Sequence, residues 1–326
     1  MSETRFTNEY ESPTDYILGI TDRIWKGRDI GLIRRCYAKD VRVHTAAGTA
    51  GGVDAVVAGT LETLHLFPDR RLLGEDVIWS DGGPGCAYSS HRIASTMHHR
   101  GDGRFGAPTG RPVHARTIAD CLVRDGRICE EWLVRDQAAI ALQLGLSPAE
   151  LGARLAGEQG PSADDHTGLR DWEAVREASG VRSVLDGSAG SQCATAMSRL
   201  WNDTELAHVR THYDPAVSLH LPGGQAAHGH AGVDRFVIGY LAAFPDARLM
   251  VDHVVTRADP GRPVRVALRW RLAGTHAGYG VFGHPSGARL LVPGITHVEL
   301  VDGRVIREYV LVDELAIWTG IGRKRG

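Results

Sequence analysis

The chain repeats itself once, and this duplication constrains the fold more than any other feature. Trp25 recurs as Trp201, 176 residues later, and the later matches keep their order with a nearly constant offset. They are Tyr37 and Tyr213, Val41 and Val217, His44 and His220, Gly-Val-Asp at 52–54 and 232–234, Phe-Pro-Asp at 67–69 and 244–246, Asp-Gly-Arg at 125–127 and 302–304, and Asp136 and Asp313. A period this long indicates two domain-sized copies rather than a solenoid.

Each copy has helical patterns first and strand patterns after them. Isoleucines at 17, 20, 24, 30 and 33 recur at helical spacing, a short strand follows at 41–45 or 217–221, and a third helix ends before Phe-Pro-Asp. Residues 264–272 alternate apolar and polar side chains, and Asp-Gly pairs at 125–126 and 302–303 predict hairpins. This order predicts an α+β fold with a mainly antiparallel sheet in each copy.

The segment between the copies has a different composition. Residues 156–165 and 186–191 are rich in glycine and small polar side chains, and these cannot bury much apolar area. We therefore expect a first domain over 13–155, a linker over 156–190 with a short helix within 172–184, and a second domain over 191–326.

Charge and cysteine content narrow the class of protein. The formal net charge is −2, with acidic and basic residues mixed, which argues against nucleic acid or an anionic membrane as a partner. No apolar run reaches the length of a membrane span, and the polar, acidic first residues do not have the pattern of a signal peptide. Five scattered cysteines without a C-x-x-C pair indicate a reduced, cytoplasmic protein.

Two motifs in the second copy carry a resemblance to a known family. Residues 270–278 read W-R-L-A-G-T-H-A-G, and 301–313 read V-D-G-R-V-I-R-E-Y-V-L-V-D. The chain resembles the SnoaL-like polyketide cyclases of the NTF2-like superfamily. The first copy keeps P-T-G-R at 108–111 and R-D-G-R-I-C-E-E-W-L-V-R-D at 124–136, but reads H-R-I-A-S-T-M-H-H at 91–99. The second copy is therefore expected to be the active one.

The resemblance implies two cone-shaped α+β barrels, each with a pocket at its wide end. Family cyclases use neither a metal nor an organic cofactor, and an aspartate late in the domain acts as acid and base. Members commonly dimerise through their sheets, so we expect the two copies to pack sheet to sheet as a pseudo-dimer within one chain, with further homodimerisation left open. The pair His228 and His230 lacks recognisable acidic or cysteine partners, so no metal site is expected.

The candidate catalytic groups follow from strand alternation. If Asp313 faces the pocket, Tyr309 and Arg307 face it too, and in the first copy Trp132 faces the pocket together with Asp136. A glycine-bulge loop in the hairpin would also place His297, or Asp120 in the first copy, toward the pocket. A plain two-residue turn would place these side chains on the opposite face. Asp313 with His297, or Asp136 with Asp120, could then serve as acid and base. Capping of the following helix is the alternative role for each closing aspartate. The expected substrate-binding residues are Tyr309, Trp132, Trp270, His220, His44, Tyr213 and Arg307.

Three functions remain open. The first is a cofactor-independent cyclase or isomerase that performs aldol-type acid/base chemistry on a small apolar carbonyl or polyketide-like compound. The second is a non-catalytic module that binds a hydrophobic ligand. The third is an epoxide or lactone hydrolase of related fold, for which Arg307 and Arg116 are the candidate arginines.

Overall fold

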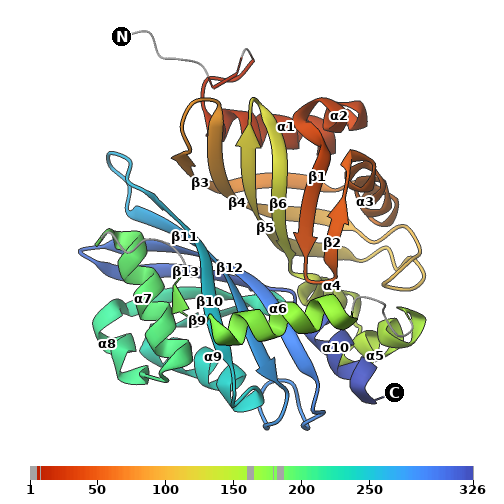
Figure 1. Ribbon diagram of the computed structural model, residues 1–326. Helices are drawn as coiled ribbons and strands as arrows, with labels where there is room; N and C mark the ends of the chain where they lie inside the picture. The colour runs from red at the N-terminus through yellow and green to blue at the C-terminus, as the bar shows by residue number, and fades with distance from the viewer. Residues whose placement is uncertain (1–5, 8, 160–164, 179, 182–186, 326) are drawn as a thin grey trace. The chain divides into compact units, whose positions relative to one another are not determined.

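The computed structural model describes residues 6–7, 9–159, 165–178, 180–181 and 187–325. The chain divides into two compact units, Met1–Gly145 and Leu146–Gly326, and each contains one twisted sheet with helices (Figure 1). The expected α+β class is confirmed, and the two sheets correspond to the two sequence copies. Sheet-to-sheet packing of the copies stays a prediction.

The first unit has a six-stranded sheet in the order β2-β1-β6-β5-β4-β3. Strand β1 runs parallel to β6, and the remaining neighbours are antiparallel. Its elements are α1 (Pro13–Trp25), η1 (Ile30–Leu32), α2 (Ile33–Cys36), β1 (Tyr37–Thr45), β2 (Gly48–Gly51), α3 (Val53–Leu66), β3 (Arg71–Asp81), β4 (Cys86–His98), β5 (Pro112–Arg124), β6 (Arg127–Arg135) and α4 (Gln137–Leu144).

The first helix illustrates how the sequence sets the core. Ser12 caps α1 by accepting a hydrogen bond from the amide of Asp15 at 3.1 Å, and proline follows at the first helical position. The buried residues Ile17, Ile20 and Ile24 lie on one side of the helix and pack into the core of this unit.

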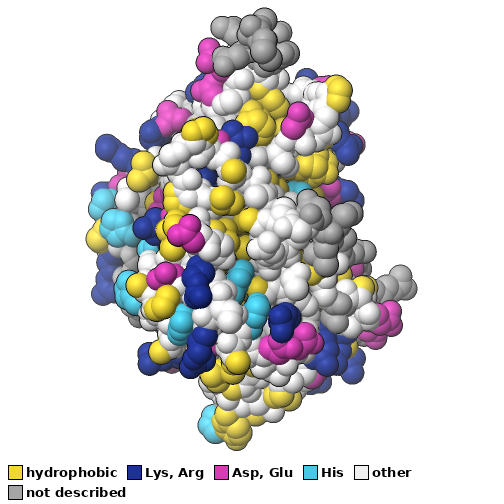
Figure 2. Space-filling model, turned by 90° about the vertical axis from the view of Figure 1, so that its left-hand side faces the viewer, with side chains coloured by type: hydrophobic (Ala, Val, Ile, Leu, Met, Phe, Trp, Pro, Cys, Tyr) yellow, Lys and Arg dark blue, Asp and Glu magenta, His cyan; other side chains and the backbone are white. Residues whose placement is uncertain are grey.

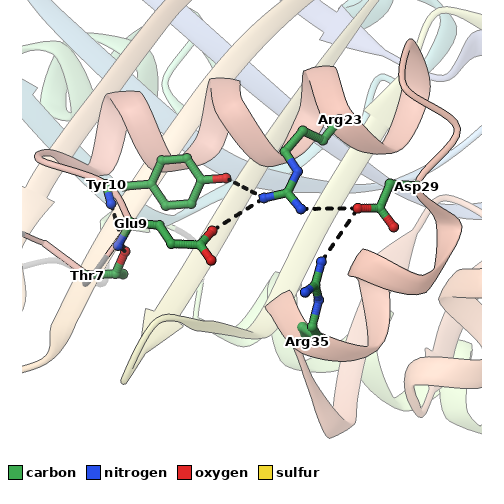
Figure 3. A network of polar contacts seen from close by, with 6 residues as sticks. All are labelled: Thr7, Glu9, Tyr10, Arg23, Asp29 and Arg35. Atoms are coloured by element: carbon green, nitrogen blue, oxygen red, sulfur yellow. Dashed lines mark hydrogen bonds and ion pairs between the residues drawn. The ribbon is translucent and has the colours of Figure 1, made fainter.

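A polar network connects the segment before α1 to the start of the domain (Figure 3). The guanidinium of Arg23 donates to Glu9 at 3.3 Å and to Asp29 at 3.1 Å, and Arg35 lies 3.5 Å from Asp29. The ring of Tyr10 lies against α1, where a Cβ added at Gly19 would come within 2.5 Å of it. Because the ion pairs are exposed, we attribute the anchoring mainly to the ring contact.

The second unit has a seven-stranded sheet in the order β7-β10-β11-β12-β13-β8-β9. Its elements are α5 (Pro148–Gln159), α6 (Asp165–Glu177), β7 (Gly180–Val181), α7 (Ala189–Asn202), η2 (Leu206–His208), α8 (Val209–His212), β8 (Tyr213–Leu221), η3 (Pro222–Gly224), β9 (Gln225–His228), α9 (Gly229–Ala243), β10 (Arg248–Arg257), β11 (Val264–Thr275), β12 (Arg289–Val301), β13 (Arg304–Val312) and α10 (Glu314–Arg325). Strands β8 and β13 repeat the parallel pairing of β1 and β6.

The helices before the second copy pack on the second unit. Helix α5, most of which lies within the range expected for the first domain, contacts α10 of the second unit, and α6, from the expected linker, contacts β10, β11 and β12. Trp172 and Val175 of α6 are buried against Met250 and Ala273. Within the expected linker, residues 160–164, 179 and 182–186 lie outside the described residues. The described part of this segment therefore contributes a helix to one face of the second sheet.

Both hairpins have the same construction. Asp125 and Gly126 have φ of 49° and 71°, and Asp302 and Gly303 have φ of 49° and 74°. Positive φ at both central positions is typical of a two-residue type I′ turn, for which Asp-Gly is well suited. A bulge follows within each hairpin, because the register skips the residue between Ile128 and Glu130 on β6 in the first copy, and the residue between Val305 and Arg307 on β13 in the second.

The surface carries mixed charge. On the face that Figure 2 presents, acidic and basic side chains are interspersed. None of the described helices is long and apolar enough to span a membrane.

Candidate functional site

A small internal cavity lies in the second unit between the sheet and its helices. The sheet contributes side chains from β8, β11, β12 and β13, and α7, α8 and α9 close the other side. The lining residues are Cys193, Met197, Leu200, Trp201, His212, Tyr213, Leu219, Val233, Phe236, Val237, Leu268, Trp270, Thr296, Val298, Glu308 and Val310. The volume is about 20 Å³, which is roughly enough for a single water molecule. A larger ligand would require the flexible side chains of the wall to move.

Strand register explains which side chains reach this cavity. Val298 pairs with Glu308, and Thr296 pairs with Val310. Cross-strand partners point to the same face of a sheet, so these four side chains share the face that the helices cover. Val305 and Val312 on β13 belong to the same buried cluster. Glu308 is therefore a carboxyl group within an otherwise apolar stripe.

Glu308 and Tyr213 form the central polar pair of the cavity. The Tyr213 hydroxyl donates a hydrogen bond to the Glu308 carboxylate. Burial raises the pKa of Glu308 from its ordinary value to about 7, and the tyrosine hydrogen bond opposes that rise. Burial, followed by the charge of Glu308, raises the pKa of Tyr213 well above its usual range. At neutral pH the carboxyl group therefore populates both protonation states, while the phenol stays protonated.

Two further polar side chains complete the lining. Thr296 accepts a hydrogen bond from the indole Nε1 of Trp270 at 3.0 Å, which holds the tryptophan ring in the wall. Burial, and secondarily the neighbouring His208, lowers the pKa of His212 to about 4. His212 is therefore neutral at neutral pH, and its ring stacks on that of His208 at a centroid distance of 5.8 Å.

The first unit contains the same tyrosine–glutamate pair. The hydroxyl of Tyr37 donates to Oε2 of Glu131 at 3.4 Å, and both residues occupy the repeat positions of Tyr213 and Glu308. Burial raises the pKa of Glu131, against the opposing effects of Arg135 and of the Tyr37 hydrogen bond. The duplication has therefore kept an interior carboxyl group in both copies.

Of the residues expected in the second pocket, the structure brings Trp270 and Tyr213 to the cavity wall. It places His297, Tyr309 and His220 side by side on neighbouring strands, on the other face of the sheet. The rings of His220 and Tyr309 stack there at 4.3 Å. On the same face Arg307 donates to Glu299 at 2.8 Å. His297, Tyr309, His220 and Arg307 were expected to face the pocket, and they lie instead on the face of the sheet opposite the cavity.

The expected orientation was derived from the closing aspartate of each copy. Asp313 follows the last residue of β13 and caps α10, accepting from the amide of Ala316 at 3.3 Å. Asp136 follows β6 and caps α4, accepting from Ala139 at 3.1 Å. Both capping alternatives are thus present in the structure. Because Asp313 lies after the end of β13, at the start of a helix, its orientation does not determine which side chains of β13 face the interior. Asp313 is not among the residues that line the cavity.

The first copy shows the same reversal. Cys121 pairs with Glu131 on the helix-covered face, so Asp120 and its partner Trp132 lie on the opposite face. His44 stacks on Trp132 at 5.2 Å, and its Nε2 lies 2.9 Å from Glu130. On β5, Arg116 donates to Glu75 at 2.7 Å. Asp120 and the interior carboxyl group of Glu131 therefore occupy opposite faces of the sheet.

The interior positions of Glu131 and Glu308 are not predicted in the sequence analysis. A signal was present, because the repeat preserves Tyr37 with Glu131 as Tyr213 with Glu308, and Glu308 shares its alternation with Val310 and Val312. A carboxylate on the same face of a strand as buried apolar side chains is unusual, and such positions are more common at functional sites. Among the described residues, no group of three or more histidine, cysteine, aspartate or glutamate side chains is arranged to hold a metal ion.

Comparison with known proteins identifies both copies with one family model. The model for SnoaL-like polyketide cyclase matches residues 16–144 and 191–321, which together form most of the chain. No curated protein matches the chain. Solved structures that resemble it include IdmH from Streptomyces antibioticus, at 26% identity over 41% of this chain and 99% of that one, with a TM-score of 0.36. A SnoaL-like protein from Jannaschia sp. CCS1 has 24% identity over 43% and 96% of the two chains, with a TM-score of 0.35.

Proposed function

The chain belongs to the SnoaL-like polyketide cyclase family, and on that premise we propose that its second copy performs cofactor-independent acid/base chemistry on a small, largely apolar carbonyl compound. The observation that carries this proposal is the position of Glu308. Its carboxyl group lies in an apolar cavity, accepts a hydrogen bond from Tyr213, and has a pKa of about 7.

The proposed step uses one carboxyl group twice. The Glu308 carboxylate removes a proton from the carbon next to the carbonyl, and the electrons of that C–H bond form an enolate. In an aldol cyclisation the enolate carbon bonds to a second carbonyl carbon, and protonated Glu308 returns the proton to the new alkoxide. A pKa near the working pH suits both steps. The hydroxyl of Tyr213 supports the ionised form of Glu308, which exists before the first step and again after the second.

Proton exchange tests the proposal without knowledge of the natural substrate. Cyclohexanone and 2-tetralone in D₂O serve as probes, and NMR follows deuterium entering next to the carbonyl. We expect the wild-type chain to accelerate exchange and Glu308→Gln to reduce the acceleration by about 10²-fold or more. Glu131→Gln is the matched control, because it makes the same change in the other copy, and it is expected to keep the activity.

Two results contradict the assignment. Exchange by Glu308→Gln at the wild-type rate would remove Glu308 from the chemistry. A wild-type chain that binds the ketones without accelerating exchange would support the second candidate function, non-catalytic binding of a hydrophobic ligand. The mostly apolar lining of the cavity favours that candidate.

A further inference from the structure

The register of the two sheets allows their interiors to be compared position by position. His91 on β4 pairs with Ala119, and Leu268 on β11 pairs with Thr296. Ala119 and Thr296 are equivalent in the repeat, because each precedes the aspartate of its hairpin turn by six residues. His91 therefore occupies, in the first copy, the position where Leu268 lines the cavity of the second.

A second position on the same strand differs in the same way. Ser89 pairs with Cys121 in the first copy, and Val266 pairs with Val298 in the second. The interior face of the first copy thus carries serine and histidine where the second carries valine and leucine. Two apolar side chains of one interior correspond to two hydrogen-bonding side chains in the other.

Both of these side chains have a buried polar atom without a hydrogen-bond partner among the described residues. The atoms are Oγ of Ser89, whose exposed fraction is 0%, and Nδ1 of His91, whose exposed fraction is 8%. A buried donor or acceptor that loses water and gains no partner is destabilising, and such groups are few in native proteins. Both side chains point into the interior, because their strand partners Val77, Ala119 and Cys121 belong to its core.

The surroundings favour a neutral ligand. Burial lowers the pKa of His91 to about 4, against the opposing effect of Asp120, so the imidazole is uncharged at neutral pH. The neighbouring core is mostly aliphatic and aromatic, so an ion placed there would lose its hydration, and the one interior carboxyl group described above, Glu131, already accepts a hydrogen bond from Tyr37. A neutral imidazole and a hydroxyl together can both donate and accept a hydrogen bond.

We propose that the interior of the first copy binds a small neutral molecule with a hydroxyl or carbonyl group, which forms hydrogen bonds with His91 and Ser89. The two copies of the chain then bind chemically different ligands. This site does not involve Glu308, so the binding proposal can be tested separately from the function proposed for the second copy.

The test uses phenol as the probe and toluene as a probe of similar shape that lacks the hydroxyl. Calorimetry measures binding to the full chain, and NMR of ¹⁵N-histidine-labelled protein follows the imidazole of His91. We expect saturable phenol binding with a shift of the His91 signal, and at least tenfold weaker binding of toluene.

The variants are His91→Leu and Ser89→Val, which introduce the residues that the second copy has at these positions and should therefore fold. Each is expected to weaken phenol binding at least fivefold. The control is Val266→Ala, at the position of the second copy that matches Ser89 and outside the lining of its cavity, and it should leave phenol binding unchanged. Circular dichroism checks that each variant is folded. Phenol binding that is unaffected in both variants, or an unshifted His91 signal at saturating phenol, would overturn the proposal and leave only water as the occupant.

Discussion

Tyr213 donates a hydrogen bond to Glu308 inside the second unit, and Tyr37 does the same to Glu131 inside the first. In each copy the tyrosine begins the strand that runs parallel to the strand of the glutamate. The parallel pairing therefore sets this contact. It also gives the interior carboxyl group a partner that stays protonated at neutral pH.

Tyr213→Phe should raise the pKa of Glu308 further. The hydrogen bond favours the ionised carboxylate, so its loss leaves burial unopposed. A hydrogen bond to a charged group contributes about 1.5–3 kcal/mol, which corresponds to an upward shift of about one unit or more. Carboxyl ¹³C NMR of glutamate-labelled protein measures the titration. A pKa that falls or stays constant in Tyr213→Phe would contradict the assigned hydrogen bond.

Stability should depend on pH through Glu308. Its folded pKa of about 7 lies above the ordinary value of 4.5, so the folded state binds the proton more tightly than the unfolded state. The stabilisation is complete below the unfolded pKa and is lost as the pH rises through 7. We expect Glu308→Gln to become more stable relative to wild type by about 3 kcal/mol between pH 4.5 and 8.

Urea unfolding at several pH values measures this difference. Taking the variant minus the wild type cancels the contributions of His91 and His212, whose lowered pKa values act in the opposite direction below pH 6.5. A difference that does not change with pH would show that Glu308 has an ordinary pKa in the folded protein.

The sequence predicted the fold well because the fold depends on local patterns that the duplication repeats. The isoleucines of α1, the aspartate-glycine turns and the alternation in β11 each predicted the element found. The interior site was harder to predict, because strand alternation gives two faces but not which one is inside. The assumption that Asp313 faces the interior leads to His297 and Tyr309 as interior residues. In the structure, the helices instead cover the face of the sheet that carries Glu308. Only the packing of α7 and α9 decides between the faces.

Asp313 is expected to act on stability rather than on proton exchange. Asp313→Ala removes the cap of α10 and should destabilise the chain by about 1 kcal/mol, whereas Asp313→Asn keeps a good capping side chain and should cost less. Asp136→Ala is the matched change at α4. Urea unfolding and the ketone exchange assay are measured together. If Asp313→Asn abolished exchange while remaining fully stable, the catalytic role expected from the sequence would be supported instead.

Gly294→Ala should displace Trp270 from the wall of the cavity. The two residues are cross-strand partners, and a Cβ added at Gly294 would come within 2.2 Å of the indole ring. The ring must move, which would break its hydrogen bond to Thr296, and overpacking of this kind costs about 1–3 kcal/mol. Urea unfolding measures the loss of stability, and tryptophan fluorescence reports the new environment of the ring.

The control is Gly59→Ala within α3, where an added Cβ meets nothing within 4 Å. It should be neutral or slightly stabilising, because alanine favours the helix over glycine. An unchanged spectrum with full stability in Gly294→Ala would show that the position of the ring does not depend on the missing side chain.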